Sequence, residues 1–332
     1  IRETSKHTKL SAARLHGPLW ERNYAAKSWI RSGGVAVTTY DLLPWAQEHI
    51  NNVEVASAVF DEAHYIKNPN AKRSLAAAEV MDSLKYVVLM TGTPLENSVQ
   101  EFRNLIGYIR SDLSDSAPEF LASKFRKHVA PAYLRRNQED VLTELPELVE
   151  IDEWMGMSDA DEHSYREAVQ EGHFMLMRRA AMLSARSLKV ERLLEIVDAA
   201  ESNGRKVIVF SYFREVLNEV ARLLHGEVFG PLTGSMPARD RQTLVDKFAA
   251  AGHGAALVAQ ITAGGVGLNI QSASVVVICE PQLKPTMEAQ AIARAHRMGQ
   301  TNTVQVHRLL SENSVDERIR EILADKKQLF DE

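Results

Sequence analysis

Short apolar runs alternate with helical patterns along most of the chain. Seven runs rich in β-branched residues stand out, three before residue 100 and four beyond residue 200: 35–40, 57–60, 86–90, 206–210, 255–260, 274–280 and 303–310. Each run is almost continuously apolar, which is typical of strands covered on both faces. Strands of this kind interleaved with helices predict right-handed βαβ units and parallel sheets. We therefore expect an α/β protein with two groups of parallel strands.

The segments between the strands favour helices and suggest where the chain divides. Residues 95–109 and 214–225 carry apolar side chains at a spacing near 3.6, the period of an amphipathic helix. The stretch 111–190 lacks the alternation of strands and helices, and we interpret it as a connector with helical insertions. The sequence thus predicts a first lobe with its connector in residues 1–140 and a second lobe in residues 141–332.

Composition narrows the class of protein. Hydrophobic residues make up 45% of the chain and charged residues 25%, as in ordinary soluble globular proteins. No apolar stretch approaches the roughly 18 residues of a membrane span, so we expect no membrane association. The single cysteine, Cys279, excludes a disulfide framework and fits a reducing, intracellular compartment, the nucleus or the cytoplasm and nucleoid. A net charge of −5 argues against a uniformly basic nucleic-acid binder but allows a local basic stripe.

Two adjacent carboxylates, Asp61 and Glu62, follow the apolar run 57–60. Ligands of open α/β sheets lie at the carboxyl ends of strands, where this pair stands. Phosphoryl transfer needs one carboxylate to hold Mg²⁺ through water and another group to polarise the attacking water. A pair of charges at the N-terminus of the next helix would explain the same residues, and the tetrapeptide alone does not decide between the two interpretations.

The next strand ends in threonines. Thr93 begins a capping box that Glu96 completes, with a proline at the first helical position, so its hydroxyl has a structural explanation. Thr91 has no such explanation and is the better candidate for contacting the nucleotide and linking its state to the other lobe. Ordinary turn chemistry at a strand end is the alternative for Thr91.

The second lobe supplies the opposite charge. Gln290, Arg294 and Arg297 stand at i, i+4 and i+7, which places them on one face of a predicted helix. Two guanidinium groups on such a face suit the spread charge of a phosphate, as an arginine finger does, whereas a solvated surface helix is the alternative. Upstream, Gly265 and Gly267 follow a strand, where backbone N–H groups can approach an anion. A glycine-rich turn is weak evidence by itself.

Six segments in sequence order resemble the Swi/Snf-type ATPases, the chromatin-remodelling and DNA-translocating family of helicase superfamily two. The segments are VFDEAHYIKN, LMTGTPLENSVQEFRNLI, APAYLRRNQEDVLTELP, KVIVFSYF, TAGGVGLNI and QAIARAHRMGQ. The resemblance implies two RecA-like lobes, each a parallel sheet flanked by helices. It also implies a DNA-dependent ATPase that uses ATP and Mg²⁺ and moves on double-stranded DNA. A DNA-bound protein complex or a polymerase is considered as a further partner, although no sequence pattern identifies one.

The resemblance also implies roles for individual residues. Asp61 and Glu62 match the pair that serves Mg²⁺ and the catalytic base, while Arg294 and Arg297 match the arginines that reach the nucleotide. Gln290 belongs to the same motif. The family's segments near the DNA backbone match further residues of both lobes, namely Thr38, Thr39, Thr233, Gly234 and Arg241. Arg135 and Arg136 match the arginine pair that stands between the lobes.

Two departures qualify the resemblance. Residues 280–285 read EPQLKP where the family has an aromatic-rich segment, which puts any aromatic contact there in doubt. No Gly-Lys-Ser/Thr sequence, the end of a phosphate-binding loop, occurs in the 332 residues. We therefore expect that loop upstream of residue 1, an incomplete first lobe, and negligible ATP hydrolysis by these residues alone. A non-catalytic nucleic-acid- or protein-binding module and a strand-separating helicase are the alternatives.

Overall fold

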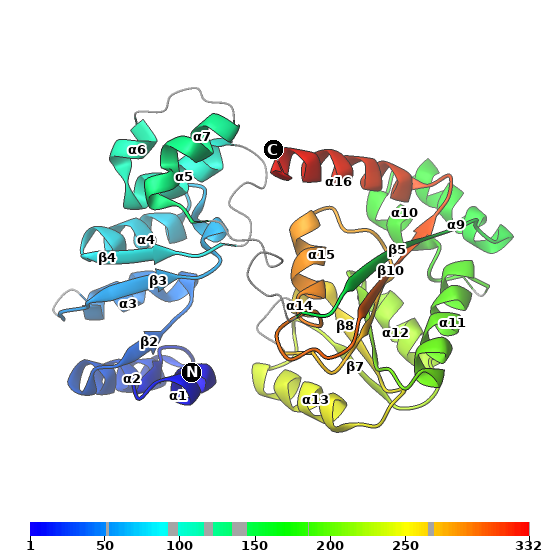
Figure 1. Cartoon of the computed structure of the whole chain (residues 1–332), viewed down its shortest axis with the longest axis horizontal. Coiled ribbons are helices and arrows are strands. Elements are labelled where there is room, and N and C mark those ends of the chain that lie inside the picture. Colours follow the sequence, from blue (N-terminus) through cyan, green and yellow to red (C-terminus); the bar gives the residue numbers. More distant parts are fainter. Residues whose placement is uncertain are drawn as a thin grey trace. The chain divides into compact units, whose positions relative to one another are not determined.

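The structure is a computed structural model of the chain. It describes residues 1–50, 53–91, 99–115, 122–134, 145–184, 186–264 and 269–331. The chain divides into two compact units, Ile1–Arg135 and Arg136–Asp331, which we call unit 1 and unit 2 (Figure 1).

Unit 1 is built on two pairs of parallel strands. The strands are β1 (Ala12–Arg14), β2 (Val35–Val37), β3 (Ser57–Phe60) and β4 (Tyr86–Leu89), and they pair as β1–β2 and β3–β4. Helix α2 (Leu19–Ser32) connects the first pair, and α4 (Lys72–Asp82) lies between the strands of the second. The further described helices are α1 (Arg2–His7), α3 (Leu43–Ile50), α5 (Val99–Ile109), α6 (Ser111–Asp115) and α7 (Ala122–Val129). The three strands predicted in this part of the chain are confirmed.

The β3–β4 pair is covered on one face. Phe60 packs with Ala76 and Val80 of α4 and with Leu105 of α5 in a buried cluster. On the opposite face the side chains stay exposed, at 59% for Val59, 58% for Tyr86 and 50% for Val88. The expectation that these strands are covered on both faces is therefore wrong for unit 1. Both faces of these strands carry apolar side chains that could be covered by helices. Within the described part of the chain, helices cover only one of the two faces.

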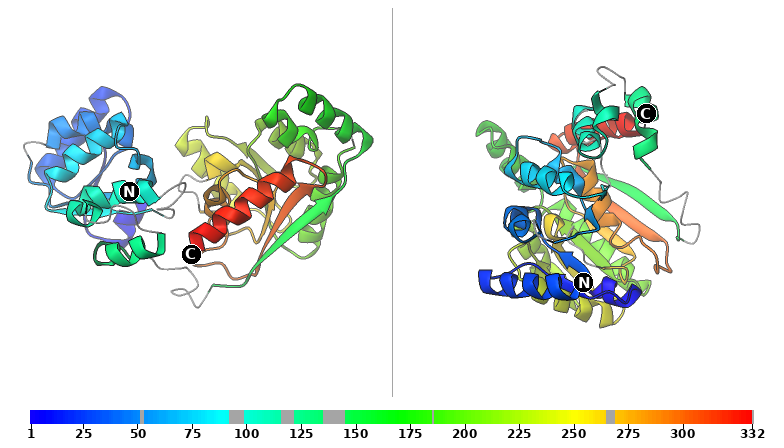
Figure 2. Two further views of the ribbon diagram at one scale, coloured as in Figure 1. Left: turned by 90° about the horizontal axis from the view of Figure 1, so that it is seen from above. Right: turned by 90° about the vertical axis from the view of Figure 1, so that its left-hand side faces the viewer.

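Unit 2 contains a six-stranded sheet in which every described strand pair is parallel. Its green and orange-red strands, residues 148–155 and 304–311, run side by side in Figure 2. Its strands, in spatial order, are β5 (Leu148–Met155), β10 (Val304–Ser311), β9 (Val275–Ile278), β6 (Val207–Ser211), β8 (Ala256–Gln260) and β7 (Val228–Leu232). The described helices are α9 (Asp159–Gln170), α10 (Phe174–Ala180), α11 (Leu188–Ser202), α12 (Arg214–Leu223), α13 (Ala238–Ala250), α14 (Ile261–Gly264), α15 (Pro285–Ile292) and α16 (Val315–Asp331).

Alternate residues of the central strands pack on opposite faces of this sheet. In β6, Val207 and Val209 belong to the cluster that contains the apolar stripes of α11 and α12. Ile208 and Phe210 belong to the cluster on the other face, with residues of α13 and α15. All four side chains are fully buried. The continuous apolar runs therefore have the predicted meaning in unit 2, where helices cover both faces.

Two strands of unit 2 are absent from the sequence-based prediction. β5 lies in the stretch interpreted as a connector, and its burial alternates between half-buried and exposed residues because it is an edge strand. β7, the other edge strand, contains Gly230 and Pro231 and shifts register against β8 between Phe229 and Leu232. Glycine and proline weaken the strand signal of such a run. Among the described helices, none is both long enough and apolar enough to cross a membrane.

Candidate functional sites in the two units

The acid pair of unit 1 stands at the carboxyl end of β3. Backbone hydrogen bonds continue the pairing of β3 and β4 past the last strand residues: the N–H of Met90 donates to Phe60 (2.9 Å), and that of Ala63 donates to Met90 (2.8 Å). This ladder brings Thr91 next to the Asp61–Glu62 turn. The half-buried Thr91 therefore follows a residue that is bonded on both sides of the acid pair, at Phe60 and Ala63.

Glu62 has an unusual backbone. Its φ of 51° and ψ of 47° lie in the left-handed region, which few residues other than glycine adopt. Glu62 precedes a 3₁₀ turn, Ala63–Ile66, but its side chain does not cap that turn. Its carboxylate lies 3.3 Å from Nδ1 of His64, whereas Oδ1 of Asp61 accepts the N–H of Glu62 at 2.9 Å. The two carboxylates make different contacts, and the side chain of Glu62 forms no capping hydrogen bond with the 3₁₀ turn.

Tyr40 ties the end of β2 to the acid pair. Its hydroxyl donates to the carbonyl oxygen of Asp61 at 2.8 Å. Burial, followed by the nearby carboxylates of Asp61 and Glu62, raises the pKa of Tyr40 well above its ordinary value, so the phenol stays a donor. Thr38 and Thr39 directly precede this tyrosine; the hydroxyl of Thr38 donates to the Leu15 carbonyl at 3.1 Å, and Thr39 is exposed.

The arginines of unit 2 do not lie on a helix. α15 includes Gln290 but ends at Ile292, and Arg294 and Arg297 belong to the turn that follows, so the predicted helical face is wrong beyond Ile292. The carbonyl of Arg294 accepts the N–H of Ile270 at 3.2 Å instead of continuing a helical ladder. Gly299, with a φ of 94°, then reverses the chain in a conformation that glycine favours. We call residues 293–300 the arginine turn; Gln290, Arg294 and Arg297 are all half-buried.

Gln300 holds the arginine turn from within. Its buried amide nitrogen donates to the carbonyls of Gln271, Ala273 and Ala295 at 3.0, 2.8 and 3.3 Å. Its amide oxygen accepts the backbone N–H groups of Thr301 and Asn302, both at 3.0 Å. The RAHRMGQ segment contained this residue, but its role depends on carbonyl groups that no sequence pattern places nearby.

His296 ties the same turn to the chain that enters β5. Its Nε2 lies 2.7 Å from the carbonyl oxygen of Pro146 and must donate to it, because a carbonyl only accepts. The N–H of Val304, at the start of β10, donates to the neighbouring carbonyl of Glu147 at 2.9 Å. The segment before β5 is thus bonded to the arginine turn and to the central sheet.

A buried ion pair fixes α15. Nε of Arg308 lies 2.7 Å from Oε2 of Glu288, and the two side chains are 8% and 6% exposed. The N–H of Gln282 donates to the other oxygen of Glu288 at 2.9 Å, and Glu150 of β5 approaches Arg308 at 2.5 Å. Although burial lowers it, the carboxylates of Glu288 and Glu150 raise the pKa of Arg308 above its ordinary value. The helix that carries Gln290 is therefore fixed by β10 and β5.

The departure at 280–285 contains a second buried carboxylate. Glu280 is fully buried and accepts hydrogen bonds from the Ser211 hydroxyl (2.8 Å), the Tyr212 N–H (2.6 Å) and the Gln282 amide (3.0 Å). Burial raises the pKa of Glu280, and these donors oppose that shift. A guanidinium nitrogen of the buried Arg178 donates to the Pro281 carbonyl at 2.8 Å. Polar contacts anchor this segment to the end of β6.

The nucleic-acid candidates of unit 2 lie at and after the end of β7. The N–H of Gly234 donates to the side chain of Gln260 at 3.3 Å, and the Thr233 hydroxyl lies 3.0 Å from that of Ser235. Arg241 stands in the first turn of α13, and its Nε is buried without a hydrogen-bond partner among the described residues. Predicted residues Gly265, Gly267, Thr93, Arg135 and Arg136 lie outside the described residues.

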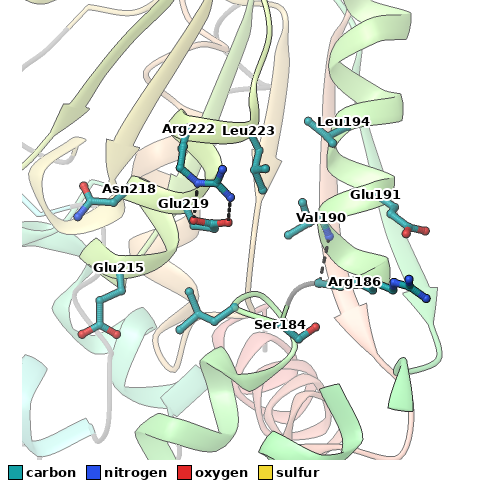
Figure 3. Close-up of a pocket in the computed structure, with 12 residues that line it drawn as sticks. Ser184, Arg186, Val190, Glu191, Leu194, Glu215, Asn218, Glu219, Arg222 and Leu223 are labelled. Atoms are coloured by element: carbon teal, nitrogen blue, oxygen red, sulfur yellow. Dashed lines mark hydrogen bonds and ion pairs between the residues drawn. The ribbon is translucent and has the colours of Figure 1, made fainter. Parts of the chain in front are cut away.

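None of the predicted residues that the structure describes lines the hollow beside α11 and α12 of unit 2. That hollow, of about 780 Å³, lies between α11 and α12 (Figure 3). The ion pair of Glu219 with Arg222 stands on one side and the start of α11 at Val190 on the other. The predicted residues of unit 2 that the structure describes instead belong to the end of β7 and the turn after it, α15, the arginine turn and α13.

The residues of unit 1 suit Mg²⁺ only as a water-mediated site. In the described part of the chain, no group of three or more His, Cys, Asp or Glu side chains could hold a metal ion by itself. Mg²⁺ beside a nucleotide needs only one or two carboxylates, because phosphate oxygens and water complete its shell. The exposed carboxylate of Asp61 at the strand end fits that limited requirement.

Parallel sheets with chemical groups at their strand ends are typical of the RecA-like class of helicases, and comparison with known proteins supports this class. The SNF2-related domain family matches residues 1–206, and the helicase conserved C-terminal domain family matches residues 188–299. Because the first match covers more than half of the chain, the chain belongs to the SNF2-related family. The resemblance to Swi/Snf-type ATPases is confirmed.

Relatives occur in bacteria and eukaryotes. YwqA of Bacillus subtilis, whose name describes an ATP-dependent helicase/translocase, is 27% identical over 97% of this chain and 40% of its own length. The mouse SWI/SNF-related matrix-associated actin-dependent regulator of chromatin subfamily A member 1 is 27% identical over 86% of this chain and 32% of its length. The solved C-terminal part of the Fun30 ATPase domain covers 57% of this chain and 97% of its own, with 18% identity and a TM-score of 0.49. The chain spans two fifths or less of these curated relatives.

Proposed function

We propose that the whole protein is a Swi/Snf-type ATP-dependent translocase on double-stranded DNA, and that this chain supplies its acid pair and its arginines. The observation that carries the proposal is the strand-end turn of unit 1. There Glu62 adopts a left-handed conformation beside Asp61 and Thr91. Strained backbone of this kind costs about 1–3 kcal/mol and clusters at functional sites, so its position after a parallel strand favours a catalytic role.

The proposed roles follow from the chemistry of each group. Asp61 would hold Mg²⁺ through water, and the ion would neutralise charge on the phosphate oxygens. Glu62 would orient and polarise the attacking water. Arg294 and Arg297, supported by Gln290, would stabilise the charge that develops on the same triphosphate. Thr91, together with Gly265 and Gly267, would contact the nucleotide.

The proposed DNA contacts lie at strand ends, and those of unit 1 are next to the acid pair. Thr38 and Thr39 directly precede Tyr40, which is bonded to Asp61. A change at the acid pair can therefore reach the threonines through one side chain. In unit 2, Thr233, Gly234 and Arg241 would contact the duplex backbone, to which hydroxyl, N–H and guanidinium groups all donate.

The activity of these 332 residues by themselves differs from that proposed for the whole protein. They contain no Gly-Lys-Ser/Thr sequence, which favours a nucleic-acid- or protein-binding module over a complete ATPase for this chain by itself. We propose that the chain alone binds ATP weakly and hydrolyses it negligibly. DNA-stimulated ATP turnover by the isolated chain would contradict this.

The experiment that tests the proposed function uses the full-length protein with Glu62→Gln. Nucleotide binding is expected to persist while DNA-stimulated hydrolysis stops, because the amide cannot polarise the attacking water. Glu54→Gln is the matched control, since Glu54 is an exposed carboxylate before the other end of β3. Equal turnover by the two variants would remove Glu62 from the chemistry. A strand-displacement assay then separates a translocase from a strand-separating helicase.

A further inference from the structure

The first forty residues are basic in a chain that is acidic overall. They contain seven lysines and arginines against two acidic residues, a formal charge of +5, whereas the whole chain carries −5. These residues form α1, β1, α2 and β2 of unit 1. A local excess of this size is the electrostatic feature expected of a surface that meets a polyanion.

The basic side chains of this segment are not neutralised by the chain itself. In unit 2, exposed arginines such as Arg166, Arg222 and Arg318 form ion pairs with glutamates one helical turn away. Within the described structure, by contrast, a set of cations from the first forty residues forms no ion pair: Lys6, Lys9, Arg14, Arg22, Lys27 and Arg31. Arg22 lies over the ring of Trp45, 4.8 Å from its centroid, whereas the positive charges of the other five are available to a ligand.

Arg14 and His16 form a pair of donors at the end of β1. A guanidinium nitrogen of Arg14 lies 3.3 Å from Nδ1 of His16. Because a guanidinium only donates, Nδ1 must be the unprotonated nitrogen of the ring, and Nε2 carries the proton. Both side chains are exposed. The end of β1 thus presents a cation and an imidazole N–H donor together.

This pair lies beside the threonines that we propose contact DNA. The N–H of Leu15 donates to the carbonyl of Val37 at 2.8 Å, so the carboxyl ends of β1 and β2 are adjacent. The Thr38 hydroxyl donates to the Leu15 carbonyl at 3.1 Å and fixes the two ends together. Gly17, with a φ of 102°, then turns the chain into α2.

We propose that Arg14 and His16 extend the Thr38–Thr39 segment into one surface that binds the phosphate backbone of duplex DNA. Arginine, histidine N–H and threonine hydroxyl groups are donors that suit phosphate oxygens, and such contacts carry no base sequence. The inference rests on the proposed function because it assumes that the chain engages duplex DNA.

The test measures binding of a short fluorescent DNA duplex to this chain by anisotropy across a salt series. Arg14→Gln should lower the slope of log affinity against log salt by about 0.9, the value for one lost phosphate contact. If both proteins bind equally at about 1 M salt, this difference in slope makes the binding of the Arg14→Gln protein about eightfold weaker than that of the unaltered chain at about 0.1 M salt. Arg14→Lys should restore most of the slope, because a phosphate contact depends on charge. His16→Ala should weaken binding and leave the slope unchanged, because the donor it removes is neutral.

Arg31→Gln is the matched control. Arg31 is an exposed arginine without an ion pair in the last turn of α2, at the opposite end of that helix from Gly17. The 14 residues of α2 separate its two ends by roughly 20 Å. Equal losses in Arg14→Gln and Arg31→Gln, or no loss in Arg14→Gln, would overturn the inference and leave the proposed function standing. If the unaltered chain binds no duplex, both the inference and the DNA contacts of the proposed function are wrong.

Discussion

Replacing Arg308 by methionine should destabilise unit 2 by about 3–5 kcal/mol, the usual cost of removing one partner from a buried ion pair. Methionine keeps most of the volume of the side chain, so the loss is chiefly electrostatic. Glu288, at 6% side-chain exposure, would remain as a buried carboxylate with one backbone donor, the N–H of Gln282. Glu150 is 43% exposed and would regain water, so it should add little.

A substitution of Glu288, the other member of the ion pair, tests the expected loss of stability further. Glu288→Gln should by itself cost less than Arg308→Met, because Arg308 keeps contacts with Glu150 and with Asp152 at 3.5 Å. In the double variant no uncompensated buried carboxylate remains, so its free energy of unfolding should be closer to the wild type than that of Arg308→Met alone. The cycle should therefore be strongly non-additive, by about 2 kcal/mol or more.

Urea unfolding is the assay, followed by hydrogen exchange of the β9 and β10 amides so that unit 2 is observed separately from unit 1. Arg318→Met is the control, because Arg318 forms an exposed ion pair with Glu321. Such surface pairs are worth only about 0–1 kcal/mol. A loss in Arg308→Met no larger than in Arg318→Met, or additive effects in the cycle, would refute the reasoning.

Two further predictions concern buried polar groups of unit 2. Gln300→Glu keeps the shape of the side chain but removes the donor that serves three carbonyls, so it should cost about 1–3 kcal/mol or more in urea unfolding; an unchanged midpoint would remove Gln300 as the support of the arginine turn. Burial raises the pKa of Glu280, so the folded state binds the proton of this carboxyl group more tightly than the unfolded state does. The resulting contribution to the free energy of unfolding is complete below about pH 4.3, the ordinary pKa of glutamate, and is lost as pH rises through the raised pKa. Glu280→Gln should remove that loss and gain stability relative to the wild type from pH 5 to 8, and a pH-independent difference between the two proteins would contradict the assignment.

The central strands of unit 2 could be predicted from sequence because burial on both faces produces continuous apolar runs. β6 shows this directly, since neighbouring residues such as Val209 and Phe210 pack into different clusters and both must be apolar. The edge strand β5 could not be recognised in the same way, because only alternate residues are shielded. In unit 1, Val59 and Val88 have the sequence of a covered face but remain exposed, and no local pattern distinguishes these cases.

The position of Asp61 and Glu62 at the end of a strand could also be predicted, because a strand and the residues after it are a local pattern. The arginine turn could not. The end of α15 depends on Ile270, whose N–H donates to the Arg294 carbonyl, and on Gln300, which donates to the carbonyls of Gln271 and Ala273 in another loop. The contact between His296 and Pro146 spans 150 residues. Long-range hydrogen bonds of this kind decide where the helix ends, and helical spacing carries no information about them.

ATP turnover by the full-length protein with Arg297→Ala tests the central claim most directly, since that claim joins the acids of unit 1 and the arginines of unit 2 in one reaction. DNA-stimulated turnover should fall by roughly 10³-fold or more with nucleotide binding retained, as for loss of an arginine finger. Arg318→Ala, which removes an exposed charge elsewhere on unit 2, should turn over normally. Near-normal turnover by Arg297→Ala would show that the two sets of residues do not act on the same triphosphate.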